Sequence, residues 1–427
     1  MVRQNKDKSK FLKKFIQSSL ACSQNNLSLF LDYNIISEDV AEILEKQLKN
    51  FTDLQMSLKS CYLGNICFTT LVSGIANCTN LKSMKLDLYN NQIQAEGAYQ
   101  LSLAIQNFEN IETIQIDLRR NNIRHQGLFK LASSFQNCQY LSTLILGLKS
   151  NNISGKDTIK SFTALAQSKT LKTLALNLSK NNINASCAID ICSELVKNTT
   201  IQNLKIDFSK NFISNLGLIG SCQHLFNSTY IQSLVLRLCN AIITDDGLLC
   251  LKNTLIQGKI IPSLAIDFQG NNLSEQSVSE FISCIGSTQI QVFKLNINEV
   301  PINLEQSCLG FDKSQFANLI NLDICFEFNN PKESQLQLLG AVIANLPKLS
   351  ILRLVIKRWD QENYFPLFDG IARCKNIKTF LIYAFPYYQY FRVANVEKKI
   401  YKKLRKIKSL VHKQILYKNL TEETFAL

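Results

Sequence analysis

Proline is scarce in this sequence, and long apolar runs are missing. Only six prolines occur among the 427 residues, and no stretch rich in proline, glycine and serine divides the chain. No apolar stretch approaches the roughly 18–20 residues that cross a bilayer. These absences predict one elongated domain that has no internal linker and no integral membrane segment.

Motifs of catalysis are also missing. The three histidines, His125, His224 and His412, lie too far apart along the chain to suggest a catalytic triad or a metal cluster. Two glycine-lysine pairs occur, but neither has the rest of a phosphate-binding loop. We therefore expect a protein that is not an enzyme and that has no cofactor and no metal site.

A repeat dominates the sequence instead. The stretch "LKTLALNLSKNNI" (171–183) alternates apolar and polar residues like a strand with one buried face, and its register recurs in 111–123 and 201–213. Weaker units bring the total to about 13. Seven consecutive units follow a strict 30-residue period, and their first apolar residues are Leu81, Ile111, Leu141, Leu171, Ile201, Ile231 and Ile261.

Each unit also contains a helical stretch. In "GAYQLSLAIQNF" (97–108), Leu101, Ala104 and Ile105 recur at spacings of three and four residues, which is typical of a helix with one apolar face. The unit is therefore predicted to be a strand, a turn and a helix.

The pattern LxxLxLxLxxNxI, followed by a helix that often begins near a glycine, resembles the ribonuclease-inhibitor-like class of leucine-rich repeats. The resemblance covers residues 24–391. It implies an α/β solenoid, a horseshoe with a parallel concave sheet and helices on the convex side. The strand pattern is two residues longer than in that class. The class includes inhibitors, GTPase activators and immune sensors, so the fold alone does not give the function.

Asparagines recur where each strand ends and the chain bends inward. A buried turn leaves backbone N–H and C=O groups without partners, and an amide side chain can bond both kinds of group. We predict that these side chains form a structural ladder, which Ala241 interrupts, so that the turn at Ala241 should differ slightly. The ladder residues are Asn91, Asn121, Asn151, Asn181, Asn211 and Asn271.

Charged residues also recur in register, an acidic row at the end of the strand and a basic row just beyond it. Like charges on adjacent strands repel, a cost that a purely structural surface does not need. We interpret both rows as a candidate partner-binding surface; the alternative is a solvated surface whose charges neutralise one another. The candidate residues are Asp87, Asp117, Arg119, Arg120, Lys149, Lys180, Asp207, Lys210, Arg237 and Asp267.

The positive charge is concentrated at the two ends of the chain. Of the net charge of +14, residues 1–14 carry +5 and residues 392–427 carry +7, so the repeats are nearly neutral. We expect a basic segment or cap at 1–23 and a basic amphipathic helix at 392–427 that caps the last repeat; a membrane-surface helix is the alternative. Nucleic acid is an improbable partner for the repeats, whereas the basic ends suit an acidic partner.

Fourteen cysteines are present, yet the N-terminal "MVRQNKDKSKFLKKF" lacks the apolar run of a secretory signal. We therefore expect buried, reduced thiols, such as Cys78 and Cys138, in a cytoplasmic protein.

Two functions agree with these observations. The first is a non-enzymatic scaffold or adaptor that holds a protein partner on the concave face. The second is a regulator of a small GTPase, because the repeat class resembles that of the Ran GTPase-activating proteins. Those proteins have an acidic C-terminal region, however, whereas this chain ends in the basic stretch "VEKKIYKKLRKIK" (396–408).

Overall fold

The computed structural model describes residues 2–22, 25–49, 51–259, 261–300, 309–311, 316–327, 332–359, 365–374, 376–386, 402, 405 and 410–417. The chain divides into two compact units, Met1–Phe212 and Ile213–Leu427, although no linker separates them in the sequence. In a repeat protein each repeat contacts only its neighbours, so a division into parts needs no change in composition. The two units are described in turn.

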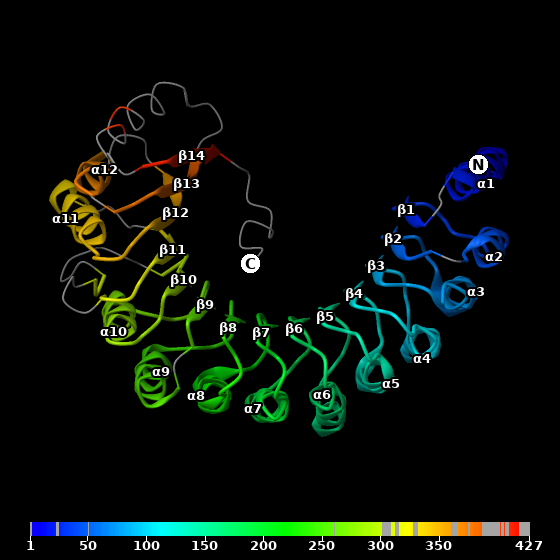
Figure 1. Ribbon diagram of the computed structural model, residues 1–427, viewed down its shortest axis with the longest axis horizontal. Coiled ribbons are helices and arrows are strands. Elements are labelled where there is room, and N and C mark those ends of the chain that lie inside the picture. The colour runs from blue at the N-terminus through cyan, green and yellow to red at the C-terminus, as the bar shows by residue number, and fades with distance from the viewer. Residues whose placement is uncertain are drawn as a thin grey trace. The chain divides into compact units, whose positions relative to one another are not determined.

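Unit 1 is a parallel sheet covered by helices on one face (Figure 1). No described helix of unit 1 lies on the opposite face, and we call it the open face. The strands lie in chain order: β1 (Asn26–Phe30), β2 (Asp53–Ser57), β3 (Ser83–Asp87), β4 (Thr113–Asp117), β5 (Thr143–Gly147), β6 (Thr173–Asn177) and β7 (Asn203–Asp207). The helices are α1 (Val2–Cys22), α2 (Glu38–Gln47), α3 (Gly64–Ala76), α4 (Ala95–Ile105), α5 (Arg124–Ser134), α6 (Ile159–Ala166) and α7 (Ala185–Leu195).

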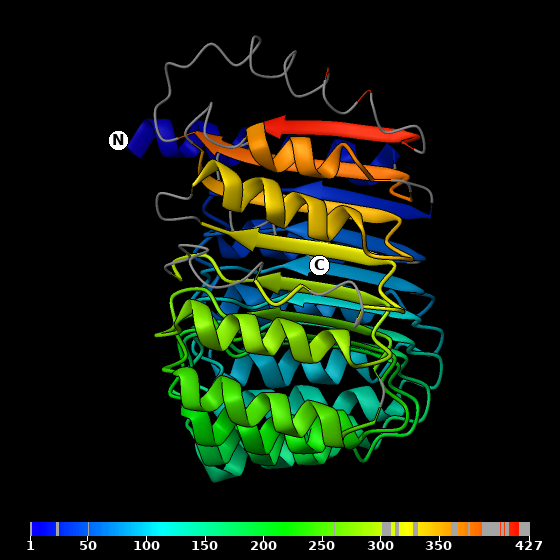
Figure 2. The ribbon, with the colours of Figure 1, turned by 90° about the vertical axis from the view of Figure 1, so that its left-hand side faces the viewer.

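Unit 2 repeats this arrangement, and its strands β11 to β14 run in the same direction (Figure 2). Its strands are β8 (Ser233–Arg237), β9 (Ser263–Asp267), β10 (Val292–Asn296), β11 (Asn321–Phe326), β12 (Ile351–Trp359), β13 (Thr379–Pro386) and β14 (His412–Tyr417). Its helices are α8 (Ser214–Asn227), α9 (Asp245–Gln257), α10 (Glu275–Gly286), α11 (Glu333–Ala344) and α12 (Phe365–Ile371). Both units confirm the predicted α/β repeat solenoid.

The alternating leucines form the core between sheet and helices. In the repeat around β6, Leu174, Leu176 and Leu178 are all buried, whereas Ala175 and Asn177 between them are half-buried on the open face. Burial of one such side chain contributes roughly 1.5–3 kcal/mol. Because every repeat has this pattern, one register between neighbouring strands is favoured throughout the sheet of each unit.

Glycine brings consecutive helices close together in the middle of unit 1. A Cβ atom on Gly127 of α5 would lie 2.9 Å from the Cβ of Ala98 and 3.0 Å from the Cα of Ala95, both in α4. Real Cβ atoms almost never approach so closely, so this position requires glycine for packing rather than for backbone freedom.

The N-terminal helix packs on the first repeat. Leu12, Ile16 and Leu20 of α1 are buried, and Lys13 forms an ion pair with Asp39 at the start of α2. The helix contacts α2 and β1.

The structure corrects one part of the expected C-terminal helix. Residues 412–417 form strand β14, which pairs in parallel with β13, with Thr379 opposite His412. A further strand satisfies the backbone groups along β13, which a helix packed on the last repeat would leave unpaired. Most of 392–411 lies outside the described residues. In the aromatic segment 383–391, residues Tyr383–Pro386 belong to β13, and the remainder also lies outside the described residues.

Candidate partner-binding surface

The ladder asparagines join each turn to the preceding one, as Asn121 illustrates. Its Oδ1 accepts hydrogen bonds from the N–H groups of Asn91 (3.0 Å) and Ile93 (2.9 Å) in the preceding turn. Its Nδ2 donates to the C=O groups of Leu88 and Leu118, both at 2.9 Å. One amide thus satisfies four buried backbone groups.

The other members of the ladder bond in the same way to their own turn and to the preceding one. They are Asn91, Asn151, Asn181, Asn211 and Asn271, and like Asn121 each is at most 8% exposed.

The expectation of a different turn at Ala241 is wrong. Ala241 is buried and its N–H donates to Oδ1 of Asn271 at 3.0 Å, as an asparagine at this position would. Its neighbours Asn240 (φ 50°) and Ile242 (φ 62°) have the left-handed backbone seen in the other turns. The amide of the following repeat is enough to hold this turn.

The acidic row is largely committed to the turns. The Oδ1 atom of each aspartate accepts the N–H of the residue two positions later, at 2.9–3.2 Å, and thereby stabilises the bend after the strand. Asn177 and Asn296 make the same bond from equivalent positions. These aspartates are therefore structural, a role that we did not predict. They are Asp87, Asp117, Asp207 and Asp267.

Burial affects the charge of this row. It raises the pKa of Asp87, and the neighbouring carboxylate of Asp117 raises it further. Burial also raises the pKa of Asp267. At Gly147 the row has no side chain, and a Cβ there would lie 2.7 Å from Oδ1 of Asp117. The row is a line of closely packed, partly desolvated carboxylates rather than a free acidic stripe.

The basic row differs from the acidic one because much of it is exposed. Arg119 clasps Asp117, with Nε 2.9 Å from Oδ1 and Nη2 2.6 Å from Oδ2, and its guanidinium lies 5.6 Å from the centre of the Tyr89 ring. Arg120 lies 5.7 Å from the same ring, and Arg120, Lys180 and Lys210 are exposed. We call Arg119, Arg120, Lys149, Lys180 and Lys210 the basic edge.

The backbone holds the basic edge in line. The N–H of Asn90 donates to the C=O of Arg119 at 2.9 Å, that of Arg120 to Lys149 at 2.8 Å, and that of Lys180 to Ser209 at 3.0 Å. Successive turns are therefore stacked at the spacing of the strands, about 4.8 Å.

The basic edge lies in unit 1, and the next three turns along the chain have no counterpart to it. The seven turns at 32–35, 59–62, 89–92, 119–122, 149–152, 179–182 and 209–212 contain six basic residues and one acidic residue, Asp32, whereas those at 239–242, 269–272 and 298–301 contain no basic residue and one glutamate. A general abundance of lysine in the chain would not produce this difference.

Arg237 lies in the row at the strand ends, where its repeat position predicted it. It ends strand β8, opposite Asp267 of β9. Its Nε and Nη2 atoms are buried and have no hydrogen-bond partner among the described residues. It belongs to the tightly packed row at the strand ends and not to the exposed turns.

An apolar patch on the first two repeats escaped the sequence analysis. Tyr33 and Ile35 in the turn after β1, and Tyr62 in the turn after β2, are each at least 65% exposed. Phe30 at the end of β1 and Ile66 in α3, in the same two repeats, are also exposed. These repeats depart from the consensus, so the alignment that revealed the charged rows did not reveal this patch. We call these five residues the apolar patch.

A buried ion pair lies on the sheet of unit 2. Nη1 of Arg353 in β12 is 3.0 Å from Oδ2 of Asp323 in β11, and the side chain of Asp323 is only 3% exposed. Burial raises the pKa of Asp323, against the opposing effects of Arg353 and Lys294. Tyr383 covers the guanidinium at 4.5 Å. This pair is packed into the sheet and leaves little charge for a partner.

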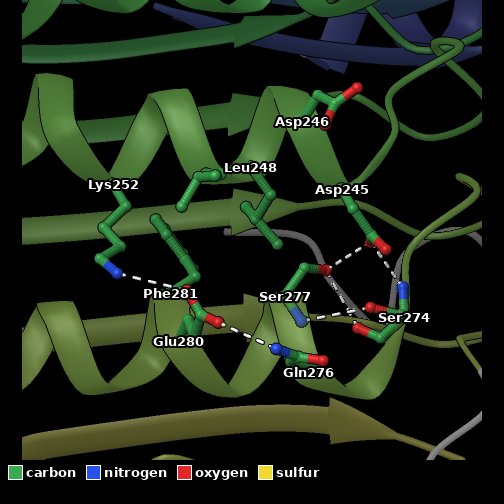
Figure 3. A pocket seen from close by; sticks show the side chains of 10 residues that line it. Asp245, Asp246, Leu248, Lys252, Ser274, Gln276, Ser277, Glu280 and Phe281 are labelled. Carbon is green, nitrogen blue, oxygen red and sulfur yellow. Dashed lines mark hydrogen bonds and ion pairs between the residues drawn. The ribbon is translucent and has the colours of Figure 1, made fainter.

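A pocket lies between α9 and α10 of unit 2 (Figure 3). Asp245 accepts hydrogen bonds from the N–H of Ser274 (2.7 Å) and the hydroxyl of Ser277 (2.6 Å), while Lys252 pairs with Glu280 at 3.3 Å. Burial would raise the pKa of Asp245, but these hydrogen bonds outweigh it and lower the pKa. The polar groups thus connect two helices and stabilise their packing.

Other features bear on the predicted classes. Within the described residues, no group of three or more His, Cys, Asp or Glu could hold a metal ion. No helix in that part of the chain is long and apolar enough to span a membrane. Cys78 and Cys138 are buried thiols, and burial raises the pKa of Cys138 to about 11.

Comparison with known proteins gives little. No family model matches the chain, and no curated protein matches it. Among solved structures, "Leiomodin-1 Actin-Binding Site 2 (ABS2)" is similar with a TM-score of 0.28 and 15% sequence identity, over 37% of this chain and 86% of that chain. An overlap this low carries no argument about function.

Proposed function

We propose that this chain is a non-enzymatic, cytoplasmic scaffold or adaptor of the ribonuclease-inhibitor-like repeat class, and that unit 1 holds a protein partner along the basic edge. The observation that carries the proposal is the concentration of six basic residues, against the single acidic Asp32, in the seven turns of unit 1. Repeat proteins commonly use such extended surfaces for binding.

The backbone conformation of the edge supports a binding role. Arg120 (φ 54°), Lys180 (φ 55°) and Lys210 (φ 57°) have left-handed backbones, which cost an ordinary residue roughly 1–2 kcal/mol. Glycine adopts this conformation freely and occupies the equivalent place at Gly270 (φ 69°). Cationic side chains at three strained positions are not needed for the turn, which favours a role outside the fold.

The proposal is tested by comparing the proteins retained from the native cell by the wild-type chain and by two charge-reversal variants. The first variant, Lys180→Glu with Lys210→Glu, alters the basic edge. The control, Lys172→Glu, reverses an exposed charge at the opposite end of strand β6. We expect the first variant alone to lose specific proteins. Equal retention by all three chains would contradict the proposal. No described residue favours the alternative of a GTPase regulator.

A further inference from the structure

The apolar patch and the basic edge form one continuous surface. The N–H of Tyr33 donates to the C=O of Lys59 at 2.7 Å, and that of Ser60 donates to Tyr89 at 2.8 Å. Tyr89 in turn lies beneath the guanidinium groups of Arg119 and Arg120. The turns that carry the patch are therefore stacked directly on those that carry the cations.

This surface has two chemically different ends. At one end, Tyr33, Ile35 and Tyr62 expose aromatic and aliphatic groups. At the other end, Lys180 and Lys210 are exposed cations, and the exposed Phe212 shares the turn of Lys210. Between them, Lys59 pairs with Asp87 at 3.2 Å and with Asp32 at 3.7 Å, and Arg119 pairs with Asp117, so the middle is nearly neutral. An occupant must therefore be apolar at one end and acidic toward the other.

The dimensions suit a short extended chain. Five strand spacings of about 4.8 Å separate the turn of Tyr62 from that of Lys210, which is about 24 Å along the edge. An extended peptide advances about 3.3 Å per residue, so about seven residues span this length.

We propose that this surface binds an extended acidic segment of a protein partner, whose apolar side chain rests on the apolar patch and whose carboxylates follow the basic edge. The proposal rests on the proposed function, because it names the chemistry of the partner bound at the same surface.

A peptide fits better than a single-stranded nucleic acid. A nucleic acid carries one phosphate per nucleotide and would meet the carboxylates of Asp87 and Asp117 beside the cations, whereas a peptide can leave neutral residues there. Base stacking does not separate the two ligands, because the rings of Phe30, Tyr33 and Tyr62 would accept a base as well as an apolar side chain. An acidic segment with an apolar anchor uses both kinds of group.

The test measures fluorescence anisotropy of labelled probes with the full chain. The main probes are two decapeptides of alternating glutamate and serine, one beginning and one ending with Trp-Leu. The comparison probes are the same peptides with glutamate replaced by glutamine or with Trp-Leu replaced by Ser-Ser, and a ten-nucleotide oligothymidylate. We expect at least one main probe to bind about tenfold more tightly than either of its comparison peptides, and less tightly as salt is added.

Variants locate the binding. Lys180→Gly with Lys210→Gly removes the cations in favour of the residue that this backbone prefers, so the fold is kept, and we expect binding about tenfold weaker. Tyr33→Ser with Tyr62→Ser should abolish the preference for Trp-Leu. Ile242→Ser is the matched control, since Ile242 is exposed at the position in unit 2 that corresponds to Tyr62, and binding should stay within twofold.

Three results would overturn the inference: tighter binding of the oligothymidylate than of any peptide, no binding of the acidic peptides, or equal binding by the chain that lacks Lys180 and Lys210. The proposed function would survive each of them if Lys180→Glu with Lys210→Glu still lost specific cellular proteins. It would fail separately if those proteins were retained.

Discussion

Replacement of Asn181 by alanine tests the asparagine ladder most directly. The Oδ1 of Asn181 accepts from the N–H groups of Asn151 (2.8 Å) and Ile153 (3.2 Å). Its Nδ2 donates to the C=O groups of Leu148 (2.9 Å) and Leu178 (3.0 Å). Alanine would leave all four groups without these bonds, and Asn181 is fully buried.

The expected loss follows from the cost of unsatisfied groups. A buried donor or acceptor left without a partner costs roughly 1–3 kcal/mol. No other described side-chain amide accepts from the two N–H groups that Asn181 satisfies. Structural relaxation and the entry of water at the mutated site reduce the total of these penalties. We therefore expect Asn181→Ala to lower the free energy of unfolding by about 2–4 kcal/mol.

Urea denaturation followed by circular dichroism measures this change, provided that the slope m of the mutant matches that of the wild type. The control is Asn203→Ala, which removes an exposed amide whose hydrogen bond to Thr173 is 3.3 Å long. We expect a change of no more than about 0.5 kcal/mol for the control. An equally small change for both Asn181→Ala and Asn151→Ala would refute the reasoning.

Three further predictions concern packing, charge and the end of the sheet. Gly127→Ala should lower stability by about 1–3 kcal/mol in urea denaturation, because its Cβ would clash with α4; an unchanged midpoint would show that the helices can separate freely. Asp87→Asn should raise stability at pH 7, while asparagine keeps the hydrogen bond to the N–H of Tyr89. The pKa of Asp87 is raised in the fold, so the carboxyl group contributes its full stability below the unfolded pKa of 3.8. That contribution is lost as the pH rises through the folded pKa. Denaturation at pH 7 and pH 4 checks this, and an advantage that does not shrink toward pH 4 would contradict it. Truncation after residue 410 removes β14 and uncovers the backbone of β13, so the chain should melt earlier and associate in light scattering; a monomer with unchanged melting would exclude this role for β14.

The amino-acid sequence by itself determined the repeat, the parallel strands and the position of the ladder. These follow from local patterns: alternation places Leu174 and Leu176 on one face, and a 30-residue period places Asn151 and Asn181 in equivalent turns. A solenoid makes such inference reliable, since each repeat contacts only its neighbours and the register of one strand sets that of the next.

The tertiary structure alone decided how each charged side chain is used. Asp117 and Arg120 lie three residues apart in the same repeat. The carboxylate of Asp117 is held by a backbone N–H and by Arg119, whereas the side chain of Arg120 is exposed. The charge of a residue does not reveal whether a neighbouring donor already satisfies it. The same reason hid the apolar patch, because exposure of Tyr33 and Tyr62 depends on which side chains surround their turns and not on their own sequence pattern.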